Sequence, residues 1–487
     1  MKCSKIPAII IYGILICVGF ACRLFSVTAT IPISIVCMIP LIYLISYSCN
    51  KKNENNNIDN EESKLILSTE TSSNNKEEEL LTPTSSIISP TTTKKKRHYY
   101  FDNLKVFLTV IVVVHHTACA FVGTSWFYGL GNFDGNTFKF FGNATLLLNQ
   151  SYFMSLFFFI SGYFIPPSYD KKTEYEFMLN KSKRLGIPFY LFSCIVNPLL
   201  IFTLIFAYNN GEYKGGELIY TYAFMPGVAW YIAWLFLFST LYTTIRKDNN
   251  NSIPTKPTLS KCLCYGFIVG MIQLFILMGF PTVTSLGMMP ITWGSLPMDI
   301  LFFIAGIYAK RGNWLDVNQE TTQPQTIFIT PTERTFVRIF TIFCIITSYV
   351  AAYLMFEAKI TGPKETYGVW ALLSGPYAIT MSVCLIDLFQ QNFNYKTERT
   401  AFFSKSAYMV YLFHPWVLVT FTFVYNYILK HVCNIIVEFE NHSFASTTPI
   451  PSEYIWIGFF SVGIITQIVV WPLSFYLRQL PGLRSVM

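Results

Sequence analysis

Residues 99–116 read YYFDNLKVFLTVIVVVHH. The apolar run that starts here and continues beyond His116 has the length, about 20 residues, that a helix needs to cross a bilayer. Ionisable side chains inside such a helix are costly, so Asp102, Lys105 and the histidines are functional candidates. On a helix, Lys105 and His116 lie about 20° apart and about 16 Å along the axis, whereas His115 points about 80° to the other side. The alternative is an ordinary helix with a snorkelling lysine and two histidines bonded to neighbours.

The composition is that of a membrane protein. Of 487 residues, 52% are hydrophobic and only 13% are charged, whereas charged residues make up about a quarter of a soluble domain. The net charge is +8, but the Lys and Arg residues are scattered through short loops between apolar runs and do not form one basic face. We therefore predict an all-α polytopic bundle in a lipid bilayer and no nucleic-acid partner.

The cysteines indicate neither a disulfide framework nor a metal site. Most of the 12 Cys lie inside apolar segments, where cysteine behaves as a small hydrophobic residue. The pairs Cys262-x-Cys264 and His431-x-Cys433 are too sparse for a closed metal site, which needs about four ligands. We predict no metal.

Apolar stretches of spanning length recur along the chain. We count about twelve, near residues 6–22, 31–48, 101–122, 146–165, 187–207, 220–244, 262–280, 296–309, 336–356, 367–389, 407–429 and 454–477.

The chain divides into four parts. Residues 1–49 hold two apolar spans, or a signal sequence and one span, because Lys2 and Lys5 precede the first run and Val27-Thr28-Ala29 follows it. Residues 50–97 are rich in Asn, Ser, Thr, Glu and Lys and predict a disordered cytoplasmic linker. Residues 98–480 form the membrane domain of about ten spans, and 481–487 form a tail.

Charge asymmetry orients the spans. If both termini are cytoplasmic and the spans alternate, most Lys and Arg residues fall on the cytoplasmic side, as the positive-inside rule requires. The exceptions are Arg23, Lys139, Lys214, Lys359, Lys364 and Lys430. The sequons at Asn143 and Asn441 then fall in loops predicted to lie outside.

A second motif reads FFFISGYF at 157–164 and is followed by KSKRLGIP at 181–188. Lys181 and Arg184 are three residues apart, so on a helix they lie on neighbouring turns and can bind one polyanion together. The alternative is a positive-inside cluster only. Ser161-Gly162 also has a structural interpretation, since small residues in a span let helices approach closely.

Together these motifs resemble the acyltransferase 3 family of integral membrane acyltransferases, which includes bacterial O-antigen and peptidoglycan O-acetylases and the glucan succinylation protein. The family's first span carries an Asp, a basic residue and a His, which Asp102, Lys105 and His116 match. Further matching positions are Phe158, Ser161, Gly162, Tyr163, Lys181, Arg184, Leu185 and Pro188, with weaker echoes at Trp230-Tyr231, Phe303 to Gly306, Ser406 to Tyr408 and Tyr411 to Pro415. Lys stands at 105 and 181 where many relatives have Arg, which removes the planar fork of a guanidinium.

The resemblance implies transfer of an acyl group, with acetyl expected, from acyl-CoA to a hydroxyl of a carbohydrate or lipid-like acceptor. A neutral imidazole within hydrogen-bond reach can take the proton of a hydroxyl that attacks a thioester. We assign that role to His116, with Asp102 and Lys105 as further catalytic candidates. Direct transfer and an acyl-histidine intermediate both remain open.

The donor would bind at the cytoplasmic side. Lys181, Arg184 and Lys105 are the candidates for its phosphates. Ser161 and His414 are secondary candidates for the functional site as a whole. His414 could instead bond a neighbouring helix ahead of a kink at Pro415.

Two other classes of function compete with an enzyme. Buried charges such as Asp299 and Asp387 can line the path of a transporter or channel, although we find no repeat between the halves. The third possibility is an inactive acyltransferase-like scaffold, against which the retention of His116 argues.

Overall fold

The computed structural model shows a bundle of helices that begins with the third predicted part of the chain. Described are residues 98–122, 129–130, 137–208, 226–245, 254–279, 284–286, 289–291, 295–315, 329–358, 363–437, 448–480 and 483–486. The predicted N-terminal spans, the linker and the sequon at Asn441 lie outside these residues.

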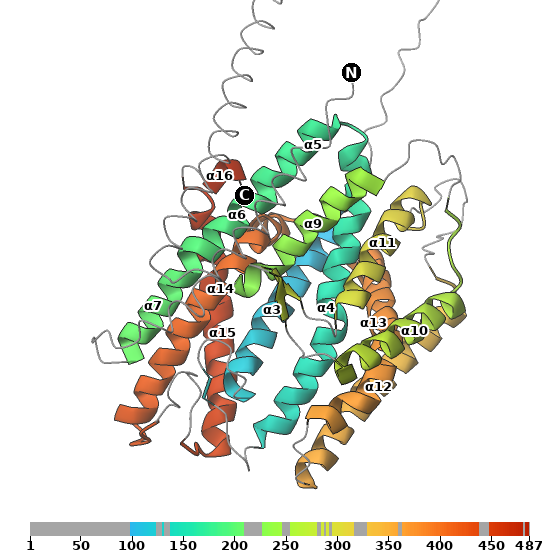
Figure 1. Cartoon of the computed structure of the whole chain (residues 1–487). Coiled ribbons are helices and arrows are strands. Elements are labelled where there is room, and N and C mark those ends of the chain that lie inside the picture. Colours follow the sequence, from blue (N-terminus) through green and yellow to red (C-terminus); the bar gives the residue numbers. More distant parts are fainter. Residues whose placement is uncertain are drawn as a thin grey trace, which may run out of the picture. The chain divides into compact units, whose positions relative to one another are not determined.

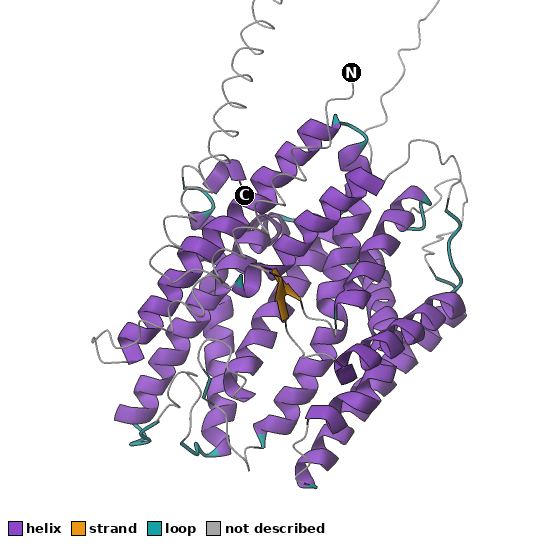
Figure 2. Ribbon diagram, in the orientation of Figure 1, coloured by secondary structure: helices purple, strands orange, loops and turns teal. Residues whose placement is uncertain are grey.

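The elements follow one another as shown in Figures 1 and 2. In chain order they are α3 (Tyr99–Val122), α4 (Phe138–Tyr169), α5 (Glu174–Lys181), the π-helical turn η2 (Ser182–Gly186), α6 (Ile187–Leu191), the π-helical turn η3 (Phe192–Val196), α7 (Asn197–Tyr208), the 3₁₀ turn η4 (Gly227–Ala229), α9 (Trp230–Ile245), α10 (Leu259–Gly279), β1 (Thr284–Leu286), β2 (Met289–Ile291), α11 (Leu296–Arg311), α12 (Pro331–Glu357), α13 (Pro363–Asn392), α14 (Glu398–His431), α15 (Ser452–Leu477) and α16 (Leu483–Val486).

The predicted all-α membrane bundle is confirmed. In the described part of the chain, eight helical stretches are long and apolar enough to cross a membrane, and they begin at Tyr99, Phe138, Glu174, Gly227, Leu259, Pro331, Glu398 and Ser452. The predicted spans at 296–309 and 367–389 are also helical, as α11 and α13. Because α11 has 16 residues, it is shorter than the roughly 20 residues that a span requires.

Local sequence signals fix several helix starts. At α5, the side chain of Thr173 accepts from the backbone of Glu176 while the Glu176 carboxylate accepts from the backbone of Thr173. Thr330 and Glu333 form the same reciprocal cap at α12. Such a capping box satisfies two backbone donors that a helix start leaves unpaired.

The helix α3 lies inside the bundle, where it contacts α4, α13, α14 and α15 (Figure 1). Its side chains Tyr100, Phe101, Leu104 and Leu108 are fully buried. In contrast, α10 and α12 lie at one edge of Figure 1 and are the least buried of the spanning stretches. Apolar side chains of these two helices, such as Phe275, are exposed on the surface of the bundle, as expected of a surface that contacts lipid.

Two glycines bring α4 and α11 into direct backbone contact. A Cβ atom added at Gly162 would collide with the carbonyl oxygen of Phe303, and one added at Gly306 would collide with that of Phe159. Small residues at such a crossing allow dispersion contacts between two backbones in lipid. The close-approach interpretation of Gly162 therefore agrees with its position.

Three local features differ from the sequence-based expectation. Asn143 lies inside α4 and is half-buried, and so the prediction of a loop sequon there is wrong, because α4 begins at Phe138. Ser182–Gly186 is π-helical, so Lys181 and Arg184 do not follow α-helical spacing. Finally, β1 and β2 form an antiparallel pair in which Thr284 is opposite Ile291 (Figure 2).

Candidate active site

The structure brings together His116 of α3 and His414 of α14. The Nδ1 atom of His116 lies 2.8 Å from the Nε2 atom of His414, and the two rings stack with centroids 4.9 Å apart. His414 is fully buried, whereas His116 is partly exposed. The first catalytic candidate, His116, therefore has a buried polar partner.

The second nitrogen of His414 contacts its own helix. Its Nδ1 atom lies 2.9 Å from the carbonyl oxygen of Tyr411 and 3.2 Å from that of Val410. Helix α14 continues through Pro415 to His431. His414 is thus held on both sides of its ring.

His115 has different surroundings, as the helical periodicity predicts. Its ring packs against Phe153 of α4, with centroids 5.0 Å apart. Its Nδ1 atom is buried and has no hydrogen-bond partner among the described residues. We therefore keep His115 outside the candidate site.

Asp102 and Lys105 form an ion pair one turn apart on α3. The Lys105 Nζ atom lies 3.3 Å from Asp102 Oδ1 and 5.1 Å from the ring centroid of Phe164. Along a continuous helix Lys105 remains about 16 Å from His116. The structure does not bring this ion pair to the histidines.

Lys181 and Arg184 lie at the same end of the bundle as the start of α3. The Lys181 Nζ atom lies 5.2 Å from the centroid of the Phe177 ring, while the Arg184 side chain is exposed. The backbone carbonyl of Arg184 accepts a 2.8 Å hydrogen bond from Tyr408 of α14. That bond ties the π-helical turn η2 to the helix that carries His414.

Lys310 is a further cation at this end that is not among the site residues predicted from the sequence. Its Nζ atom lies 3.4 Å from the hydroxyl of Tyr163 and 5.0 Å from the centroid of that ring. Tyr163 also contacts Phe101 of α3. In the sequence, only the adjacent aromatic residues Tyr163 and Phe164 point to this place. In the structure each of these two rings contacts one lysine.

Ser161 links α4 to α9. Its Oγ atom lies 2.7 Å from the hydroxyl of Tyr231, and that hydroxyl donates to the carbonyl of Phe157 at 3.2 Å. A phenol has one proton to donate, so Ser161 donates to the Tyr231 oxygen. Tyr231 of the Trp230-Tyr231 motif is therefore hydrogen-bonded to Ser161 of the FFFISGYF motif.

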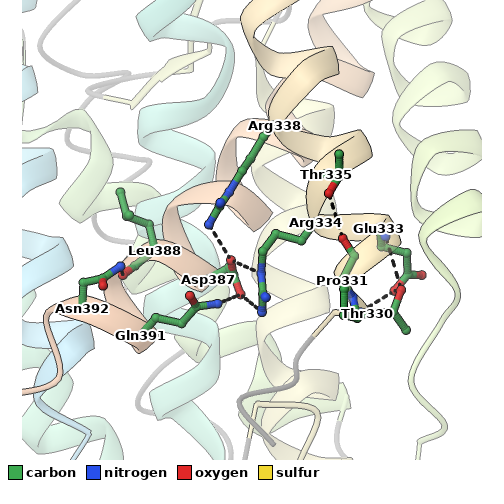
Figure 3. Close-up of polar contacts among 10 residues, drawn as sticks. All are labelled: Thr330, Pro331, Glu333, Arg334, Thr335, Arg338, Asp387, Leu388, Gln391 and Asn392. Atoms are coloured by element: carbon green, nitrogen blue, oxygen red, sulfur yellow. Dashed lines mark hydrogen bonds and ion pairs between the residues drawn. The ribbon is translucent and has the colours of Figure 1, made fainter.

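The two buried aspartates, Asp299 and Asp387, have different surroundings. Asp299 accepts a 2.8 Å hydrogen bond from Ser155, which joins α11 to α4. Asp387 of α13 accepts two hydrogen bonds from Arg334, at 2.9 and 3.1 Å, and one from Gln391. Figure 3 shows this cluster with Arg338, whose guanidinium lies 3.5 Å from the same carboxylate. Both oxygens of Asp387 are therefore engaged in joining α12 to α13.

Within the described residues, no group of three or more His, Cys, Asp or Glu side chains is placed to hold a metal ion. A family model described as an acyltransferase domain, that of acyltransferase 3, matches residues 98–482. The matched region begins just before α3 and ends just after α15. No curated protein and no solved structure matches the chain.

Proposed function

Because this chain belongs to the acyltransferase 3 family, we propose that it transfers an acyl group from acyl-coenzyme A to a hydroxyl of a carbohydrate or lipid-like acceptor. The expected acyl group is acetyl. The family and the eight spanning stretches make it a multi-pass membrane acyltransferase. The donor, the acyl group and the acceptor class are the parts that we propose.

The hydrogen bond between His116 and His414 carries the proposal. It gives a partly exposed imidazole a fixed orientation inside the bundle. In the proposed reaction, His116 takes the proton of the acceptor hydroxyl while the hydroxyl oxygen attacks the thioester carbonyl. The C–S bond then breaks, and His116 returns the proton to the leaving sulfur, which gives an ester and free coenzyme A. General base catalysis of this kind contributes about 10² to 10⁴ in rate.

The donor phosphates would bind at the end of the bundle that carries Arg184. Exposed Arg184 and half-buried Lys181 supply positive charge there, and Lys105 and Lys310 add two more cations beside Phe164 and Tyr163. Charge-assisted hydrogen bonds to phosphate are the strong kind. The long pantetheine arm of coenzyme A would span the distance from these cations to His116, which from Lys105 is about 16 Å along α3.

The test is transfer of label from radiolabelled acetyl-CoA into the glycan and lipid fractions of membranes. Wild type, His116→Ala and His431→Ala are compared at matched expression, and His431→Ala is the control because it removes an exposed imidazole at the end of α14. We expect label with wild type and His431→Ala only. Equal labelling in all three would exclude His116 as the base, and no labelling with acetyl-CoA or longer acyl-CoAs would favour a transporter or scaffold.

A further inference from the structure

Pro415 changes the hydrogen bonding of the helix turn that carries His414. In an uninterrupted α-helix, the backbone N–H of residue 415 would donate to the carbonyl of Tyr411. Proline has no backbone N–H, so this carbonyl loses its usual donor. The Nδ1 atom of His414 lies 2.9 Å from the Tyr411 oxygen and therefore takes the place of the missing N–H. The His-Pro sequence supplies both the vacant acceptor and its new donor.

This contact determines which nitrogen of His414 carries the proton. A carbonyl oxygen can only accept a hydrogen bond, so Nδ1 of His414 must be the protonated nitrogen. The carbonyl of Val410, 3.2 Å from the same atom, requires the same assignment. A neutral imidazole has one N–H, and burial disfavours the charged form. The Nε2 atom of His414 is therefore an acceptor.

The direction of the hydrogen bond between His414 and His116 follows from this assignment. The Nε2 atom of His414 lies 2.8 Å from Nδ1 of His116. Because Nε2 accepts, Nδ1 of His116 must donate, and the lone pair of the His116 ring is then on Nε2. The carboxylate of a serine-protease triad fixes its histidine in the same way, through the nitrogen that does not take part in proton transfer.

We propose that His414, with Pro415, is a positioning residue that holds His116 as the Nδ1–H tautomer, so that Nε2 of His116 is the atom that takes the proton of the acceptor hydroxyl. This inference rests on the proposed function for its catalytic consequence. The tautomer itself can be measured without any activity. The two ideas can therefore fail separately.

The first experiment is ¹⁵N NMR of the full chain, labelled with [¹⁵N]histidine, in detergent micelles. A protonated ring nitrogen and a lone-pair nitrogen differ clearly in chemical shift, and the signals of His116 among the six histidines are identified by their loss in His116→Gln. We expect Nδ1 of His116 to be protonated in wild type and in His414→Gln, because the Gln oxygen can accept near the position of imidazole Nε2. In His414→Leu, which has no acceptor, we expect the Nε2–H form to appear. A wild-type His116 protonated on Nε2 would overturn the proposal whatever the activity.

The second experiment separates positioning from a merely structural role. We expect His414→Leu to lower kcat about 10²-fold to 10³-fold, with the KM for acyl-CoA changed less than about threefold because the donor cations are untouched. His414→Gln should remain within about tenfold of wild type. The control His431→Gln, which changes an exposed histidine at the end of the same helix, should stay within about threefold.

Two kinetic results would overturn the positioning role. Equal losses in His414→Leu and His414→Gln would show that an acceptor at this position is not what matters. Full activity in His414→Leu would show that His116 needs no partner. If the wild type transfers no acyl group, the proposed function fails, while the NMR result still decides the tautomer.

Discussion

Arg184 and Lys181 are close in sequence but differ in environment. The Arg184 side chain is exposed, while Lys181 is half-buried over the ring of Phe177. An exposed guanidinium can move to meet a phosphate and can bind it with two N–H groups. If Arg184 binds the donor phosphates, its contribution should be to donor binding and not to the chemical step.

Arg184→Ala should therefore raise the apparent KM for acyl-CoA more than it lowers kcat. We expect an increase of about threefold to tenfold, because an exposed charge-assisted contact is screened by solvent. Steady-state rates at varied acyl-CoA measure both constants, and Lys171→Ala, an exposed lysine on the turn between α4 and α5, is the matched control. A loss of kcat at constant KM would argue against phosphate binding by Arg184.

Helical periodicity could predict the local relations among site residues but not the distant ones. The pairing of Asp102 with Lys105 and the separate direction of His115 follow from positions on one helix. The contact between His116 and His414 joins residues 298 positions apart. Neither periodicity nor hydropathy indicates which span packs against α3, so the sequence identifies both histidines as candidates but does not predict their contact.

At the scale of elements, hydropathy predicts the membrane helices because each one must satisfy its own backbone in lipid. Each predicted span from 101–122 to 454–477 overlaps a described helix, although the first residues of the span at 220–244 lie outside the described part of the chain. The π-helical turn at Ser182–Gly186 and the three-residue strands β1 and β2 were not predicted. A change of backbone hydrogen bonding over a few residues leaves no periodic signal in the sequence.

The contact between α4 and α11 should be sensitive to a single methyl group. Gly162→Ala or Gly306→Ala places a Cβ against a carbonyl oxygen of the facing helix, so the two backbones must separate at a cost of about 1–3 kcal/mol. Gly463→Ala in α15 is the matched control, because its Cβ would meet Thr117 at an ordinary 3.5 Å.

The measurement is the midpoint of thermal unfolding of the purified chain in detergent micelles. All three substitutions gain similar helix propensity, so the difference between the α4 or α11 variants and Gly463→Ala isolates the backbone contact. We expect lower midpoints for Gly162→Ala and Gly306→Ala only. Equal midpoints for the three variants would show that α4 and α11 have room to move apart.

At the scale of the whole bundle, the candidate site is extended along the axis of α3. The cations of α5 and η2 lie near the start of α3, and His116 lies about 16 Å farther along the same helix than Lys105. In the proposed reaction, acyl-CoA therefore enters from the end of the bundle that carries these cations. Acyl-CoA is highly charged and does not cross a sealed bilayer, so the side of supply can be controlled.

In sealed vesicles, transfer from acetyl-CoA should therefore depend on which end of the bundle faces the added donor. A membrane-impermeant amine reagent that modifies the exposed Lys171 and Lys172, read by mass spectrometry, reports the fraction of molecules whose Arg184 end faces outward. We expect the initial rate of label transfer to be proportional to this fraction and to rise to a common value when detergent opens the vesicles. Rates that fall as this fraction rises would mean that the donor reaches His116 from the opposite end, and the phosphates would then have to bind elsewhere than at Lys181 and Arg184.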